Sequence, residues 1–204
     1  MIFIHGLGQS PSAWKQTISL LEAEASCPDL SGFLPEQQPT YQEMYQNFVK
    51  YCSSFSGKLD LCGLSLGAVL ALHYACSYPE RVNSLILIAG QYKMPKGLLK
   101  FQNLLFRLMP NSNFTQIGFS KEQMISLTSS MRQLNFSDSL SQISCPTLIL
   151  CGEKDRVNQK ASKEMNQKIK SSTFSLIAQS GHEVNKDAPQ ELAKQIKQFY
   201  QSKI

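Results

Sequence analysis

The stretch KLDLCGLSLGAVLALHYA, residues 58–75, changes its hydrophobic period partway along. Its first part predicts a short buried strand over 58–63, and apolar residues then recur at helical spacing over 66–77. The link between them, GLSLG, contains no Pro, Asn or Asp for an ordinary turn. So short a link must turn sharply at Ser65 and force it toward positive φ, which a non-glycine residue resists.

The glycines on either side of Ser65 make such a turn possible. Gly63 and Gly67 have no side chain to collide where the strand and the helix cross. The turn presents the serine hydroxyl at the carboxyl end of a strand, where open α/β sheets bind ligands, and it aims the backbone N–H of Leu66 at the same place. The segment predicts a nucleophilic serine with one oxyanion donor, although a merely tight turn would leave the same pattern.

A serine needs a base to become a nucleophile, and the chain has three histidines. His182 follows the last predicted strand and should reach the same edge of the sheet as Ser65, so it is the predicted general base. His73 lies well inside the helix after Ser65 and points away from the turn, which predicts a packing role. His5 precedes a glycine-rich loop and is expected to brace that loop by hydrogen bonding.

The acid that orients the histidine should leave the preceding strand at the same edge. The segment TLILCGEKDRV offers Glu153 and Asp155 there. Asp155 is favoured because it has room to turn back toward His182, whereas Glu153 should be solvated. Asp155 could also cap the helix predicted over 157–169, and the two roles are compatible. The chain order Ser65, Asp155, His182 is the one expected for this architecture.

The loop after the first predicted strand, FIHGLGQS, should complete the site. Gly6 and Gly8 let its backbone approach a ligand closely. The backbone N–H of Leu7 follows the strand exit and is the predicted second oxyanion donor, beside that of Leu66.

Strand and helix patterns alternate along most of the chain, which predicts an α/β domain with a mainly parallel sheet flanked by helices. About six strands are expected, over 1–6, 26–32, 58–63, 82–90, 146–152 and 173–179. Residues 92–143 interrupt the alternation with two amphipathic helices, the second opening on a potential capping box, Ser120 with Gln123. We interpret this segment as a small helical cap inserted into a single domain spanning residues 1–204.

Composition narrows the class of protein. With 42% hydrophobic and 17% charged residues, the 204-residue chain is typical of a soluble globular domain, and no apolar run could span a bilayer. The net charge of +5 is too small to indicate nucleic-acid binding, and the N-terminus does not read as a signal peptide. Six cysteines without metal-ligand spacing should be reduced and buried, which indicates the cytoplasm. No metal or organic cofactor is expected, and the oligomeric state stays open.

Together these motifs resemble the α/β-hydrolase superfamily over nearly the whole chain. The matching pieces are HGLG at 5–8, GLSLG at 63–67, CGEKD at 151–155 and GH at 181–182. The resemblance implies the triad and the two oxyanion donors named above, and it makes residues 92–143 a lid over the site.

Two departures from the family pattern matter. Most members begin with a strand hairpin before the HG strand, whereas this sequence starts within that strand, so a minimal form of the fold is expected. The loop that reads D-x-x-G-x-G-x-S in many members is reduced to PDLSGFLPEQ at 28–37, which alters the surroundings of the site.

These residues lead us to expect a serine hydrolase that cleaves a small carboxylic ester or thioester through an acyl-enzyme on Ser65. Two alternatives stay open. A lyase or carbon–carbon bond hydrolase, such as the menaquinone-pathway lyases of this superfamily, would use the same triad on an acidic substrate. A ligand-binding module would carry the triad without using it, and fold alone does not separate these functions.

The charge of the cap bears on the substrate. Six basic residues stand there against two acidic ones: Lys93, Lys96, Lys100, Arg107, Lys121 and Arg132 against Glu122 and Asp138. These charges are most simply a solvated face. The alternative is that they attract an anionic ester or an acyl carrier group to the entrance.

Overall fold

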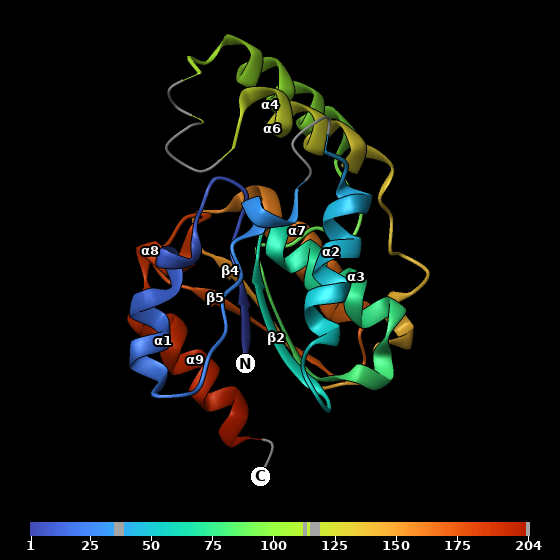
Figure 1. Ribbon diagram of the computed structural model, residues 1–204. Helices are drawn as coiled ribbons and strands as arrows, with labels where there is room; N and C mark the ends of the chain where they lie inside the picture. Colours follow the sequence, from blue (N-terminus) through green and yellow to red (C-terminus); the bar gives the residue numbers. More distant parts are fainter. Residues whose placement is uncertain (35–38, 112–113, 115–118, 203–204) are drawn as a thin grey trace.

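The computed structural model describes residues 1–34, 39–111, 114 and 119–202, and its centre is a parallel sheet (Figure 1). In this part of the chain the sheet has five strands: β1 (Ile2–Ile4), β2 (Leu59–Leu64), β3 (Val82–Ile88), β4 (Thr147–Gly152) and β5 (Ser172–Ile177). They lie side by side in chain order, and each neighbouring pair is parallel. Parallel neighbours require a crossover between them, which helices supply here. The predicted α/β class with a mainly parallel sheet is confirmed.

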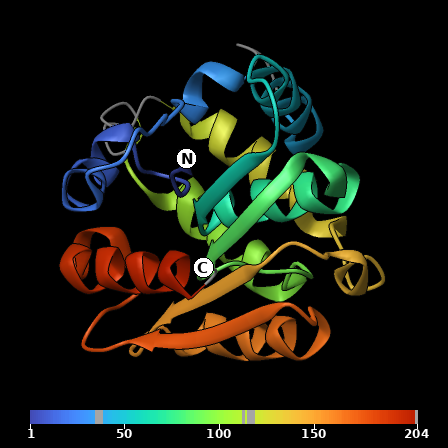
Figure 2. The ribbon, with the colours of Figure 1, turned by 90° about the horizontal axis from the view of Figure 1, so that it is seen from below.

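Helices cover both faces of the sheet (Figures 1 and 2). One face carries α1 (Lys15–Leu21) and α9 (Pro189–Gln201), preceded by the short α8 (Val184–Asp187); the other carries α2 (Tyr41–Ser53), α3 (Leu66–Ser77) and α7 (Arg156–Lys168). Strand side chains alternate between two cores, with Phe3 on the α1–α9 side and Ile4 on the opposite side. α3 is apolar and buried on nearly all sides.

The chain after β1 differs from the prediction. No strand forms over residues 26–32; Ser26 makes only an isolated parallel bridge to β1, whose Phe3 donates its N–H to the Ser26 oxygen at 2.8 Å. Pro28 lacks the N–H that a longer ladder would need, and Asp29 caps a short 3₁₀ turn. The sheet therefore has five strands among the described residues, where about six were expected.

The reduced loop at 28–37 is described only as far as Leu34. Its residues 35–37 lie outside the described part of the chain.

Two further helices lie beyond the carboxyl ends of the strands: α4 (Lys96–Leu108) and α6 (Lys121–Ser130) (Figure 1). The predicted capping box opens α6, because the Ser120 hydroxyl accepts from the Gln123 N–H at 3.1 Å and Gln123 Oε1 accepts from the Ser120 N–H at 2.8 Å. Leu127 of α6 joins the same apolar core as α2 and α3, so α6 packs on the body of the molecule. Within the described residues, no helix combines the length and the apolar character needed to cross a membrane.

Candidate active site

Ser65 sits at the sharp turn between β2 and α3. Its φ is 54° and its ψ is −113°, so the predicted positive φ is confirmed. A Cβ at Gly63 would lie 2.2 Å from the oxygen of Gly67, and a Cβ at Gly67 would lie 2.1 Å from the oxygen of Ile4. Only glycine fits at either position, because these neighbours are backbone atoms and cannot yield as a flexible side chain does. The Ser65 N–H donates to the Ile88 oxygen at 2.9 Å, which ties the turn to the end of β3.

Asp155 and His182 form a direct side-chain pair past the carboxyl ends of β4 and β5. Oδ2 of Asp155 lies 2.7 Å from Nδ1 of His182, with 6% of the aspartate side chain exposed and 43% of the histidine side chain. With its proton on Nδ1, the imidazole donates to the carboxylate and keeps Nε2 as an acceptor, the form that a general base requires. Glu153, the acid not favoured, is exposed and accepts from the Gln179 N–H at 2.9 Å.

An amide side chain holds the same carboxylate. Nδ2 of Asn158 donates to Oδ1 and Oδ2 of Asp155 at 3.0 and 2.8 Å, and Oδ1 of Asn158 accepts from Gln91 Nε2 at 2.7 Å. Burial raises the pKa of Asp155, but hydrogen bonds from His182 and Asn158 outweigh burial and hold that pKa below its usual value. Asp155 is therefore ionised at neutral pH. It also caps α7 by accepting from the Asn158 N–H at 3.4 Å, so capping and the contact with His182 coexist.

Ser65 and His182 line one cavity of about 250 Å³. Leu7, from the loop after β1, and Leu66, from the start of α3, line it as well, so segments far apart in the sequence meet at one edge of the sheet. The structure thus places four predicted site residues on this cavity and the fifth, Asp155, in contact with His182. Their catalytic roles remain predictions. The other lining residues are Val69, Ala89, Gln91, Met94, Pro95, Leu99, Gln102, Thr128, Met131 and Asn158.

The loop after β1 approaches the serine turn closely. A Cβ at Gly6 would lie 2.9 Å from a side-chain carbon of Leu64 and 3.5 Å from Cβ of Ser65. Among the described residues, neither Leu7 nor Leu66 donates its backbone N–H to another group. Both residues also line the cavity.

The other two histidines have the bracing and packing positions that the sequence predicts. His5 is fully buried; its Nδ1 lies 2.9 Å from the Gly6 oxygen, and its Nε2 accepts from the Leu30 N–H at 3.0 Å. His73 stacks on the Tyr45 ring with 3.6 Å between the ring centroids, and burial lowers its pKa to about 4. Neither ring lines the cavity.

Sequence reasoning assigned no role to four polar side chains beside these residues: Gln9, Asn158, Glu183 and Asn185. Two of them could have been singled out from the sequence, because Gln9 follows the HGLG loop and Glu183 follows His182 directly. Asn158 lies three residues after Asp155, in the first turn of α7, where an N-cap finds its partner.

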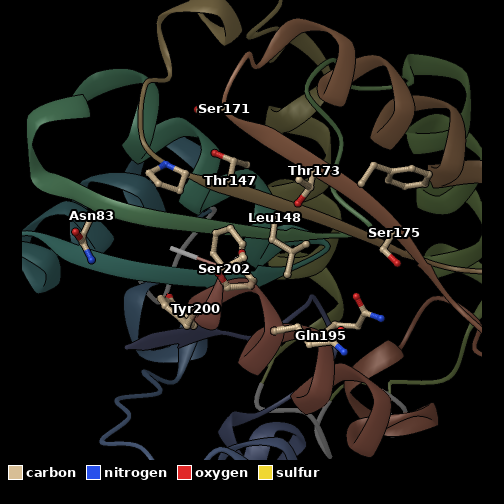
Figure 3. A pocket seen from close by; sticks show the side chains of 13 residues that line it. Asn83, Thr147, Leu148, Ser171, Thr173, Ser175, Gln195, Tyr200 and Ser202 are labelled. Atoms are coloured by element: carbon tan, nitrogen blue, oxygen red, sulfur yellow. The ribbon is translucent and has the colours of Figure 1, made fainter. Parts of the chain in front are cut away.

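A larger groove lies elsewhere, between β4, β5 and α9 (Figure 3). Its volume is about 930 Å³, and Figure 3 shows hydroxyl and amide side chains around it, among them Thr147, Thr173 and Gln195. None of its described lining residues is Asp, Glu, His, Lys, Arg or Cys, and none is a predicted site residue. The smaller cavity is therefore the candidate active site.

Metal and thiol chemistry find little support in the described part of the chain. It contains no cluster of three or more His, Cys, Asp and Glu side chains that could hold a metal ion. None of the six cysteines forms a disulfide, and burial raises the pKa of the Cys151 thiol, at the end of β4, to about 12. A thiol in that state is a poor nucleophile.

A family model described as "Alpha/beta hydrolase family" matches residues 1–195. This match covers most of the sequence, and the chain belongs to that family. The family is described as one of hydrolases, so the match supports an enzyme of the hydrolase class.

Three known proteins show what the chain is similar to. A pimeloyl-[acyl-carrier protein] methyl ester esterase of Vibrio parahaemolyticus is 28% identical over 95 residues, which are 46% of this chain and 37% of that protein. A putative 2-succinyl-6-hydroxy-2,4-cyclohexadiene-1-carboxylate synthase of Bacillus subtilis is 25% identical over 182 residues, 71% of this chain and 66% of that protein. Both alignments span less than two thirds of those relatives. The enol-lactonase of Burkholderia xenovorans shares the fold, with a TM-score of 0.85 and 15% identity over 98% of this chain and 90% of that one.

Proposed function

We propose that this chain is a serine hydrolase that cleaves a small carboxylic ester or thioester through an acyl-enzyme on Ser65. The observation that carries the proposal is the contact between Asp155 Oδ2 and His182 Nδ1, at 2.7 Å. His182 lines one cavity together with Ser65, whose backbone has a positive φ. A base oriented by a buried carboxylate and a serine presented clear of the backbone are what nucleophilic serine chemistry needs.

The reaction follows from this arrangement. Nε2 of His182 takes the proton of the Ser65 hydroxyl as its oxygen attacks the carbonyl carbon of the substrate. The N–H groups of Leu7 and Leu66 stabilise the tetrahedral oxyanion, and each lowers the activation free energy by about 3 kcal/mol. The alcohol or thiol departs with the proton from His182. The same histidine then deprotonates a water molecule, which attacks the acyl-enzyme; as the acid departs, His182 returns that proton to the Ser65 oxygen.

The cavity favours a small, uncharged acyl group. Its volume of about 250 Å³ lies below the roughly 300–1,000 Å³ usual for ligand pockets. Apolar side chains dominate its described lining, and the polar ones other than Ser65 and His182 are neutral: Gln91, Gln102, Thr128 and Asn158. The six basic residues of the 92–143 segment are absent from that lining, which weighs against an anionic group inside the cavity.

Residues 92–143 are proposed to be the cap of a single domain. Six of them line the cavity: Met94, Pro95, Leu99, Gln102, Thr128 and Met131. This placement supports a role in covering the substrate and in selecting the acyl group.

A fluorophosphonate probe tests the proposal directly. The wild-type protein should be labelled at Ser65, and the Ser65→Ala variant should not. A well-folded wild-type protein that resists labelling would contradict the serine hydrolase and favour a ligand-binding module.

A lyase is the second candidate, because the Bacillus subtilis relative is named as a synthase and aligns with 71% of this chain. A panel of nitrophenyl esters with short and medium acyl chains separates the two reactions. Turnover is expected for the hydrolase, whereas labelling without turnover would favour the lyase. Matched neutral and anionic esters, compared across ionic strength, complete the panel; a salt-sensitive preference for the anionic ester would restore a role for the cap cations.

We also place the protein in the cytoplasm. The support is that none of its six cysteines forms a disulfide, since oxidising compartments favour disulfides.

A further inference from the structure

A buried polar network joins the loop after β1 to the loop after β5. Nε2 of Gln9 donates to Glu183 Oε1 at 2.7 Å and to Asn185 Oδ1 at 3.2 Å, across more than 170 positions of sequence. Nδ2 of Asn185 donates back to Gln9 Oε1 at 3.1 Å. Gln9 is 4% exposed and Asn185 is 1% exposed, so the bonds between these two amides are shielded from water, whereas Glu183 is partly exposed.

The same glutamine holds the turn that carries Leu7. Oε1 of Gln9 accepts from the Gly6 N–H at 3.3 Å, and the Gln9 N–H donates to the Gly6 oxygen at 3.1 Å. The Leu7 amide lies between these two contacts along the chain. Gln9 therefore sets the shape of the loop that would supply the oxyanion donor.

At its other end the network reaches the neighbour of the histidine. Glu183 follows His182 directly and also contacts Lys186 Nζ at 2.9 Å. Burial raises the pKa of Glu183, but hydrogen bonds from Gln9 and Lys186 outweigh burial and hold that pKa below its usual value. Glu183 is thus an ionised acceptor for the glutamine.

The orientation of the Gln9 amide is determined by its partners. Its oxygen faces two donors, the Gly6 N–H and Asn185 Nδ2, while its nitrogen faces two acceptors, Glu183 Oε1 and Asn185 Oδ1. A flipped amide would oppose an oxygen to a carboxylate. The side chain is therefore fixed, and so is the relation between the two loops that it joins.

We infer that Gln9 is a positioning residue that holds the Leu7 oxyanion donor in register with the His182 base. The inference rests on the proposed serine-hydrolase function. Neither Gln9 nor its partners Glu183 and Asn185 line the cavity, so they would act through the loops that do. A displacement of about 1 Å between a donor and a reacting centre can cost about 100-fold in rate.

A swap of donor and acceptor tests this coupling. Gln9→Glu places a carboxylate against Glu183 and should lower kcat about 100-fold with little change in KM. Glu183→Gln keeps an acceptor for Gln9 and should stay within about threefold of wild type. In the double variant the amide introduced at position 183 would donate to the carboxylate introduced at position 9, so donor and acceptor are exchanged. Its kcat should be at least tenfold higher than that of Gln9→Glu alone.

Two further measurements separate positioning from mere stability. Labelling by the fluorophosphonate counts the active molecules, so that kcat refers to labelled serine only. An aryl trifluoromethyl ketone forms a hemiketal on Ser65 whose oxyanion needs the Leu7 donor, so its affinity should fall in parallel with kcat for Gln9→Glu and recover in the double variant.

The outcomes are distinct. A wild-type protein that resists labelling refutes the serine hydrolase and the inference together. Labelled wild type with an unimpaired Gln9→Glu, or with a double variant no better than the product of the single effects, refutes only the coupling. The coupling is also refuted if the loss of kcat disappears when kcat is calculated per labelled serine, because the loss then reflects fewer folded molecules.

Discussion

The side-chain amide of Asn158 reaches both carboxylate oxygens of Asp155, at 3.0 Å to Oδ1 and 2.8 Å to Oδ2. It also lies 3.2 Å from Nδ1 of His182, so it borders the whole pair. We expect Asn158→Ala to lower kcat about tenfold at nearly constant KM, because the carboxylate gains freedom to rotate away from the imidazole. Steady-state kinetics on one nitrophenyl ester measures this. Lys163→Ala, at an exposed position of the same helix, is the control, and equal kcat for both variants would contradict the prediction.

The choice between the two acids of the β4 loop is open to a direct comparison. Asp155→Asn removes the carboxylate that fixes the Nδ1 proton of His182, and kcat should fall by about 10⁴. Glu153→Gln should leave kcat within twofold, since the Glu153 side chain is exposed and, among the described residues, accepts only from the Gln179 N–H. The reverse pattern would assign the acid to Glu153.

The strained turn at Ser65 predicts that this residue, the proposed nucleophile, lowers the stability of the fold. Ser65→Gly should raise the free energy of unfolding by about 1 kcal/mol, because glycine adopts positive φ without steric cost. Ser65→Ala keeps a Cβ in the same conformation and should be close to wild type. Urea denaturation of the three proteins gives the values, and a stabilised alanine variant would show that the backbone strain is not the cause.

The contact between α3 and β1 predicts a severe effect at a glycine that touches no substrate. A Cβ at Gly67 would lie 2.1 Å from the Ile4 oxygen and 2.8 Å from the His5 oxygen, so Gly67→Ala should destabilise the protein by about 3 kcal/mol. Gly97→Ala, in α4, meets nothing within 4 Å and should be neutral or slightly stabilising. Thermal unfolding followed by circular dichroism compares the two. A Gly67→Ala protein as stable as wild type would contradict the close packing of the turn.

Acid should weaken the fold through His73. Burial lowers its pKa from 6.5 to about 4, so between those values the unfolded chain binds a proton that the folded chain refuses. The free energy of unfolding must therefore fall as the pH drops from 6.5 toward 4. His73→Phe keeps an aromatic ring beside Tyr45 and should show a shallower fall over that range. Urea titrations at several pH values test the difference, and parallel curves for both proteins would rule out His73 as its source.

The features that could be predicted from the sequence are those set by a short local pattern or by a general rule of parallel sheets. The turn at Ser65 is encoded within five residues, and its strand, its helix and its positive φ were all predictable from that stretch. Asp155 and His182 lie far apart along the chain, but the rule that parallel strands end at one edge was enough to bring them together. In the same way, periodicity and capping residues were enough to predict α6 and its capping box.

Other features could not be predicted, because no periodic pattern in the sequence determines them. The strand expected over 26–32 was wrong, since Pro28 and the capping by Asp29 outweigh a short apolar pattern. The bonds from Gln9 to Glu183 and Asn185 depend on how two loops meet in space, and no spacing in the sequence encodes that. Residues 92–143 were expected to form a lid over the site, but which side chains of α4 and α6 line the cavity depends on the angle at which these helices lie over the sheet.

The burial of α3 on nearly all sides divides the site into an anchored part and an adaptable part. The backbone amides of that helix should exchange with deuterated water only when the whole molecule unfolds, so Ser65 is mounted on the slowest-opening element of the chain. Asp155 and His182 sit instead on the segments that follow β4 and β5, outside that helix. Such a division lets descendants of this sequence change the molecules they accept while the Ser65 hydroxyl stays where it is.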